Sequence, residues 1–122
     1  ALAENLDAMG FYPGTHAVFG AMADKDLAAM LERIAPLIDH WHLTDLPLPR
    51  AIKADALDAL LQGHPGCRGK VAGRHASPMD ALRAAVSAAD PADRIVVFGS
   101  FYTVGGVLQD GVPRMSAKHL SA

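Results

Sequence analysis

The segment from Arg94 to Leu108 constrains the fold of this chain more than any other stretch. It opens with an apolar run, Arg94-Ile-Val-Val-Phe98, which is rich in β-branched residues and shows no polar alternation. Such a run is typical of a central parallel strand that is covered on both faces. Gly99 and Ser100 then predict a sharp turn, and a short helix is expected from Thr103. Because ligands of open α/β sheets bind at the carboxyl ends of the strands, this turn is also a candidate site.

The rest of the chain alternates between strand-like and helix-like segments. Further strands are expected at Thr15–Gly20, at His40–Thr44 and at residues 70–72, with a short one at residues 112–115. Helices are expected at residues 1–10, from Asp24 to Pro36, around Leu57, Leu60 and Leu61 up to Gly63, and from Ser77 to Ala89. This rhythm predicts an α/β fold, a three-layer Rossmann-like domain with a mostly parallel sheet and helices on both faces.

Two helix starts carry recognisable caps. Asp24 is expected to cap the first of these helices. Ser77-Pro78-Met79-Asp80 combines a capping serine, a proline at the first helical position and a carboxylate three residues after the cap. At the other end of the chain, fraying is expected beyond Ser116.

Composition sets the class of protein. The 122 residues are 51% hydrophobic and 20% charged, with a net charge of −2, which predicts one domain over residues 1–122. This balance favours neither a nucleic-acid partner nor a membrane. The single cysteine, Cys67, cannot form an internal disulfide, so a reducing, cytoplasmic setting is expected. The chain begins at Ala1 inside a helical pattern, and we expect it to be a piece of a longer protein.

General catalytic motifs are missing from the sequence. It contains neither a G-x-x-x-x-G-K-[ST] phosphate loop nor a G-x-G-x-x-G fingerprint. Gly99-Ser100-Phe101 does not match the G-x-S-x-G elbow of serine hydrolases. Taken alone, Ser100 is interpreted as a cap of the following helix. No residue is therefore assigned a catalytic role.

Metal-binding patterns are weak. His40 and His42 share one face of a strand, and His64 and Cys67 have a ligand-like spacing. Neither pair has the second pair that a zinc site requires, so no metal site is predicted. Cys67 has no acidifying neighbour in its glycine-rich loop and is expected to be an inert thiol.

Charged residues follow two of the expected strands. Asp24 and Asp26 suit the amino-terminal end of a helix, where their charge complements the helix dipole. Lys25 lies at the same helix end, where the dipole disfavours a positive charge. An interaction of its side chain with an anion such as a nucleotide phosphate would explain a lysine there. Arg50 follows Pro49 in a rigid turn, which suits carboxylate recognition or an ordinary surface arginine.

Three motifs together resemble a known family. Val18 to Asp26, Pro49-Arg50-Ala51, and Asp93 to Tyr102 resemble the C-terminal domain of folylpolyglutamate synthase/dihydrofolate synthase, in the Mur ligase superfamily. The likeness extends from Thr15 to Leu108. In that family a helix opening with Asp-x-x-His-Asn-Pro precedes this region, which would place Ala1 just after that motif.

The resemblance implies a reaction. ATP phosphorylates a carboxylate of dihydropteroate or of a folate, and the amine of L-glutamate then attacks the acyl phosphate to form an amide. ATP and Mg²⁺ would act in the full-length enzyme, whose N-terminal ATPase/folate domain is absent from this chain. The isolated domain is accordingly expected to be inactive and to bind no cofactor by itself.

The resemblance also assigns residues. Ser100 matches the glutamate-binding serine of the family, which replaces its interpretation as a simple cap. Arg50 matches the family's Pro-Arg, and a contact with the glutamate substrate is expected of it. Asp24, Lys25 and Asp26 match a motif that faces the nucleotide or the cleft. Two alternatives stay open. A different Mur-type amino-acid ligase would share the fold, although the G-S-x-Y element and the short Pro-Arg turn argue against it. A stand-alone α/β binding module would be revealed by the sequence upstream of Ala1.

Overall fold

A parallel β-sheet organises the chain, for which the computed structural model describes residues 13–23, 26–99 and 119–121. Within these ranges five strands pair in the order β3-β2-β1-β4-β5, and every pairing is parallel. The strands are β1 (Thr15–Phe19), β2 (His40–Thr44), β3 (Val71–His75), β4 (Arg94–Phe98) and β5 (His119–Ser121). The helices are α2 (Leu27–Ile34), the 3-10 helix η1 (Ala35–Leu37), α3 (Ala54–Gln62) and α4 (Pro78–Ala88).

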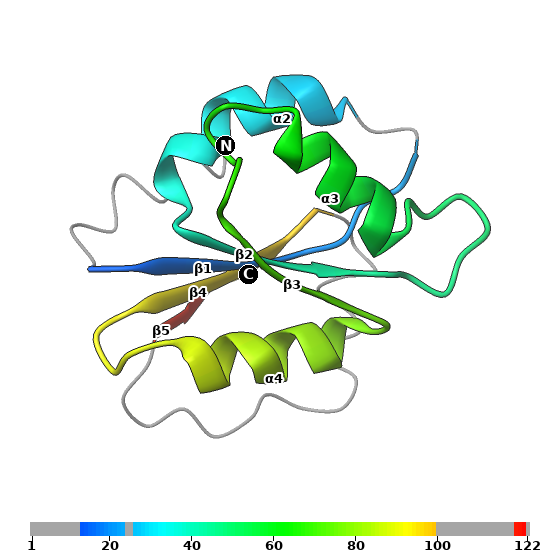
Figure 1. Cartoon of the computed structure of the whole chain (residues 1–122). Helices are drawn as coiled ribbons and strands as arrows, with labels where there is room; N and C mark the ends of the chain where they lie inside the picture. Colours follow the sequence, from blue (N-terminus) through cyan, green and yellow to red (C-terminus); the bar gives the residue numbers. More distant parts are fainter. Residues whose placement is uncertain (1–12, 24–25, 100–118, 122) are drawn as a thin grey trace.

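Helices cover both faces of the sheet. Figure 1 shows α2 and α3 on one face and α4 on the other. From β1 through β2 to β3 the chain steps outward, and α4 then leads it back past β2 and β1 to β4. Because such crossovers are right-handed, the reversal of direction transfers the connecting helix to the opposite face. The predicted three-layer α/β domain is confirmed.

Each face of the sheet has its own apolar core, because successive side chains of a strand point to opposite faces. On the face of α2 and α3, Phe19 contacts Trp41 and Phe98, with ring centroids 5.5 and 5.2 Å away. β1 and β4 are buried at every position, which confirms the central strand predicted at residues 94–98. The core on the α4 face is made of Val18, Met79, Ala81, Leu82, Ala85, Ala89, Ile95 and Val97.

The helix ends follow local hydrogen bonding. The prediction for α4 is confirmed, since the Ser77 hydroxyl accepts a hydrogen bond from the Asp80 amide at 3.2 Å. The prediction for α2 is wrong by two residues, since its cap is Asp26 rather than Asp24. The Asp26 carboxylate accepts from the Ala29 amide at 3.2 Å, so the helix begins at Leu27.

None of the helices in the described ranges has the length and apolar character needed to cross a bilayer.

The edge strands differ most from expectation. β3 extends to His75 instead of ending at residue 72, because its later residues pair with β2. The fraying expected beyond Ser116 is replaced by β5, which pairs with β4 along Arg94–Val96. Leu60, one of the apolar residues expected on α3, is 48% exposed. The helices expected at residues 1–10 and from Thr103, and the strand at 112–115, lie outside the described residues.

Candidate functional site

The strand order reverses between β1 and β4, and the carboxyl ends of these two strands lie side by side. From β1 the chain proceeds to β2 on one side, whereas β4 pairs with β5 on the other. In open parallel sheets this reversal creates the crevice in which ligands bind. We use the name carboxyl-edge site for the turn at Gly99, residues 20–23 after β1, and the loop of residues 45–53 after β2.

Gly99 brings the ends of β1 and β4 into direct contact. Its φ of 112° lies in the region that side chains disfavour. A Cβ at this position would collide with the carbonyl oxygen of Gly20 and lie 2.6 Å from the Phe19 ring. A glycine is therefore required for the chain to leave β4 against the end of β1. Ser100, the next residue, lies outside the described residues.

Backbone hydrogen bonds join the Arg50 turn to the loop after β1. The amide of Ala23 donates to the Arg50 carbonyl at 2.7 Å, and the amide of Ile52 donates to the Ala21 carbonyl at 2.9 Å. Between them Met22 and Ala51 form an antiparallel bridge. The structure therefore brings together two sequence motifs that are more than 20 residues apart.

The charged residues of the two loops have different surroundings. The Arg50 side chain is exposed, and within the described chain it forms no hydrogen bond or ion pair. Its guanidinium is therefore available to a ligand. Asp26 is exposed as well, but its carboxylate caps α2. Asp24 and Lys25 lie outside the described residues.

A pocket beside the second loop was not anticipated from the sequence. It has a volume of about 280 Å³ and lies where β2 and β3 end and α3 begins. Its charged wall includes Arg74, which pairs with Asp55 at 2.9 Å and lies 3.8 Å from Asp58. The lining residues are Asp45, Lys53, Ala54, Asp55, Arg74, His75 and Ala76.

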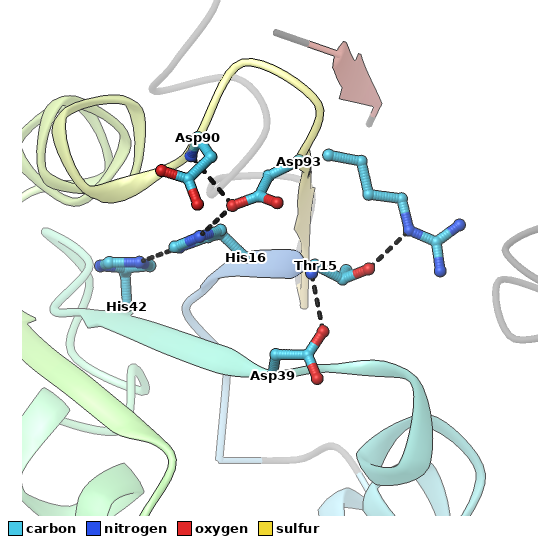
Figure 2. A network of polar contacts seen from close by, with 7 residues as sticks. Thr15, His16, Asp39, His42, Asp90 and Asp93 are labelled. Carbon is cyan, nitrogen blue, oxygen red and sulfur yellow. Dashed lines mark hydrogen bonds and ion pairs between the residues drawn. The ribbon is translucent and has the colours of Figure 1, made fainter. Parts of the chain in front are cut away.

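A buried histidine pair on the α4 face was also missed. Figure 2 shows His42, His16 and Asp93 joined in one row. His16 Nδ1 lies 3.0 Å from His42 Nε2, and His16 Nε2 lies 3.3 Å from the Asp93 carboxylate. The same carboxylate accepts from the Asp90 amide at 2.9 Å. The signal in the sequence was the alternation of His40 and His42 on one face of β2; that His16 lies beside them depends on the register of β1 and β2, which the structure gives.

Burial controls the protonation of this pair. Desolvation, followed by the charge of His40, lowers the pKa of His16, against the opposing effect of Asp93. Desolvation, followed by the neighbouring histidines, lowers the pKa of His42 from 6.5 to about 4. Both rings are therefore neutral at pH 7, which lets one donate a hydrogen bond and the other accept it.

Histidines of the two weak metal-binding patterns have hydrogen-bond partners within the protein. His42 bonds to His16, and His64 Nε2 lies 3.1 Å from the Glu32 carboxylate. Across the described ranges no three histidine, cysteine or acidic side chains converge as a metal site would require. Cys67 is buried, and this burial raises the pKa of its thiol, which disfavours the reactive thiolate.

Comparison with known proteins identifies the family. Residues 1–101 match the model of the Mur ligase glutamate ligase domain. The dihydrofolate synthase/folylpolyglutamate synthase of Haemophilus influenzae is 37% identical over 89 residues, which are 72% of this chain and 20% of that protein.

Solved structures agree with this match. The folylpolyglutamate synthase of Mycobacterium tuberculosis, complexed with ADP and AMPPCP, has a TM-score of 0.79 at 28% identity, over 93% of this chain and 27% of its own. A bifunctional folylpolyglutamate synthase/dihydrofolate synthase with Mn, AMPPNP and L-glutamate bound has a TM-score of 0.72 at 30% identity, over 89% of this chain and 25% of its own. This chain thus spans about a fifth to a quarter of the length of these relatives. The family match covers most of the chain and its fold agrees, so this chain belongs to the Mur ligase family as a glutamate ligase domain.

Proposed function

We propose that this chain is the C-terminal domain of an ATP-dependent ligase that adds L-glutamate to dihydropteroate, to folates, or to both. The observation that carries the proposal is the carboxyl-edge site, where the Gly99 turn meets the end of β1 and the loop after β1 is hydrogen-bonded to the backbone of Arg50, whose side chain is exposed. The relatives support it, because one of the solved structures has a nucleotide analogue, Mn and L-glutamate bound.

The chemistry of glutamate suits this edge. A guanidinium binds a carboxylate in a bidentate manner, and the hydroxyl and backbone amides at the start of a helix also bind carboxylates. We assign Arg50 and Ser100 to these contacts, and we place Asp24, Lys25 and Asp26 along the cleft toward the nucleotide. In this proposal the domain contributes orientation, because the glutamate amine has to face the acyl carbon for attack.

ATP and a divalent metal belong to the proposed full-length enzyme. The described residues do not fit a metal site of their own, since they bring no three potential ligands together. A bound metal with ATP would supply charge neutralisation during phosphoryl transfer. We propose that the N-terminal domain, together with this one, holds both. A cytoplasmic location is proposed on the basis of the one unpaired and buried cysteine, Cys67.

The serine assignment is tested by Ser100→Ala in the full-length enzyme. Removing a hydrogen bond to a charged carboxylate weakens binding by about 1.5–3 kcal/mol, so the glutamate KM is expected to rise about tenfold or more. The ATP KM should change little. Steady-state kinetics with each substrate varied in turn measures both.

A matched control is Ser87→Ala, which removes an exposed serine hydroxyl at the far end of α4. Its kinetics should equal those of the unmodified enzyme. An unchanged glutamate KM in Ser100→Ala would remove Ser100 from the glutamate site. An enzyme that ligates an amino acid other than glutamate would overturn the proposed function itself.

A further inference from the structure

The loop that carries Arg50 connects β2 to α3 and spans residues 45–53. Loops of this kind are mobile unless tertiary contacts hold them. Arg50 lies past the middle of the loop, and its side chain is exposed. A guanidinium that recognises a small substrate has to be held in place by contacts elsewhere in the loop.

Asp45 closes the base of the loop. Its carboxylate Oδ1 accepts a hydrogen bond from the amide of Ala54, the first residue of α3, at 2.6 Å. Its own amide donates to the carbonyl of His75 at 2.9 Å, which ties it to the end of β3. Its carbonyl accepts from the Thr44 hydroxyl at 2.7 Å. Asp45 is thus anchored in the sheet and reaches across nine residues to the start of the next helix.

The start of α3 explains why an aspartate is needed at this position. The residue at its N-cap is Lys53, whose side chain makes no capping hydrogen bond. Lysine cannot accept one, unlike the serine, threonine, aspartate or asparagine preferred there. The Asp45 carboxylate supplies the missing acceptor from the opposite end of the loop, and its charge is favourable beside the helix amino terminus.

The part of the loop around Arg50 is fixed by a second set of contacts. The Arg50 carbonyl and the Ile52 amide bond to Ala23 and Ala21 in the loop after β1. The loop is thus held by the Asp45 hydrogen bonds and by the hydrogen bonds to the neighbouring loop, in addition to the burial of Leu46 and the packing of Ile52 against the core. Removing the Asp45 carboxylate takes away the hydrogen bond that joins the two ends of the loop, and the position of Arg50 then depends on the remaining contacts.

We propose that Asp45 is the positioning residue for Arg50, so that its carboxylate sets the affinity of the ligase for glutamate without touching the substrate. This inference rests on the proposed function, in which Arg50 contacts glutamate. It assigns Asp45 a role in glutamate binding rather than in the chemical step.

Kinetics of the full-length enzyme test the inference. Asp45→Ala is expected to raise the glutamate KM about five- to tenfold while the ATP KM stays within about twofold, because orientation of one binding group is lost. Asp45→Asn keeps an acceptor oxygen and should restore most of the affinity. Hydrogen–deuterium exchange provides a second readout, since the Ala23 and Ile52 amides should exchange faster in Asp45→Ala.

Ser77→Ala is the matched control. It removes a comparable helix cap, that of α4, and leaves the Arg50 loop intact. A loss of stability alone would therefore appear in both variants, whereas a raised glutamate KM should appear only in Asp45→Ala. An equal rise in both would overturn the positioning role.

A second route keeps the test informative if Asp45→Ala does not fold. Ala54→Pro removes the donor, and proline is favoured at the first position of a helix. Lys53 already has φ −66° and ψ 150°, the extended conformation that a following proline requires. This variant should raise the glutamate KM as Asp45→Ala does, and an unchanged value would overturn the inference.

Arg50→Ala distinguishes a failure of the proposed Arg50 contact from a failure of the Asp45 role. If it leaves the glutamate KM unchanged, the proposed contact of Arg50 fails, and the inference fails with it. If it raises the KM while Asp45→Ala does not, only the inference fails. If Arg50→Ala and Asp45→Ala each raise the glutamate KM, the double variant should raise it little beyond Arg50→Ala alone, because the two changes act on one contact.

Discussion

Gly99 is the residue on which the carboxyl-edge site depends most directly. Its backbone conformation and its contact with Gly20 are linked, since only a residue without a Cβ can pass so close to the β1 end. The position therefore combines a conformational and a steric requirement. Either alone would favour glycine, and together they exclude every other residue type without local rearrangement.

Gly99→Ala is accordingly expected to destabilise the domain by about 2–4 kcal/mol, through backbone strain and the collision with Gly20 and the Phe19 ring. Gly69→Ala is the matched control. It has φ 80° but no atom within 4 Å of the added Cβ, so only the strain remains, about 1 kcal/mol. Urea unfolding of both variants measures the difference. Equal destabilisation would show that the contact with β1 carries no weight.

The other site residues differ in how well their roles could be predicted from the sequence. Asp26 could be placed at a helix start, but which of Asp24 and Asp26 caps α2 depends on one hydrogen bond to Ala29. Arg50 could be singled out by its proline turn. The contact of the Arg50 turn with Ala23 could not be predicted, because the antiparallel bridge between the two loops has no signature in the sequence of either loop.

At the scale of elements, the strands and helices most dictated by local pattern were predicted well. β4 and β1 are continuous apolar runs, and α4 carries its own cap and stripe. β3 and β5 were predicted short or not at all. Their short segments, one containing Gly73, become strands by pairing with β2 and β4, and that partnership is a property of the sheet rather than of the segment.

The histidine pair between β1 and β2 gives the sheet a pH dependence. In the unfolded chain His42 has a pKa near 6.5, and in the fold burial lowers this pKa to about 4. Between these values the unfolded state binds more protons than the folded state, so stability falls as pH drops from about 6.5 to about 4. His16, whose pKa is lowered in the same direction, adds to the effect.

For His42 this shift corresponds to roughly 3 kcal/mol of stability lost on acidification. His42→Gln should therefore reduce the loss of stability between about pH 7 and about pH 4.5. Urea unfolding at both pH values measures this loss of stability. His64→Gln is the control, because His64 lies beside Glu32 and away from the histidine pair. If His42→Gln and the unmodified chain lose equal stability, His42 does not carry the acid sensitivity.

At the scale of the whole molecule, the reversal of strand order between β1 and β4 determines where the site lies. The helix that follows β1 and the helix that precedes β4 lie on opposite faces of the sheet, and in such sheets the ligand crevice lies at the carboxyl ends of the strands at this reversal. The alternation of elements in the sequence was sufficient to predict this architecture. The pocket between β2, β3 and α3 was not predictable, because its seven lining residues come from three separate segments.

In the proposed function this domain orients glutamate and does not activate the carboxylate, which leads to the last prediction. The 122 residues contain no G-x-x-x-x-G-K-[ST] phosphate loop, and the described ranges contain no convergent metal ligands. Without a phosphate cradle no acyl phosphate can form, so the isolated chain should show no ATP-dependent glutamate ligation. Mass spectrometry of folate and dihydropteroate products measures ligation, with the full-length enzyme as positive control. Fluorescence of the buried Trp41 verifies that the isolated chain is folded. A glutamylated product made by the folded chain alone would contradict the division of labour proposed between the two domains.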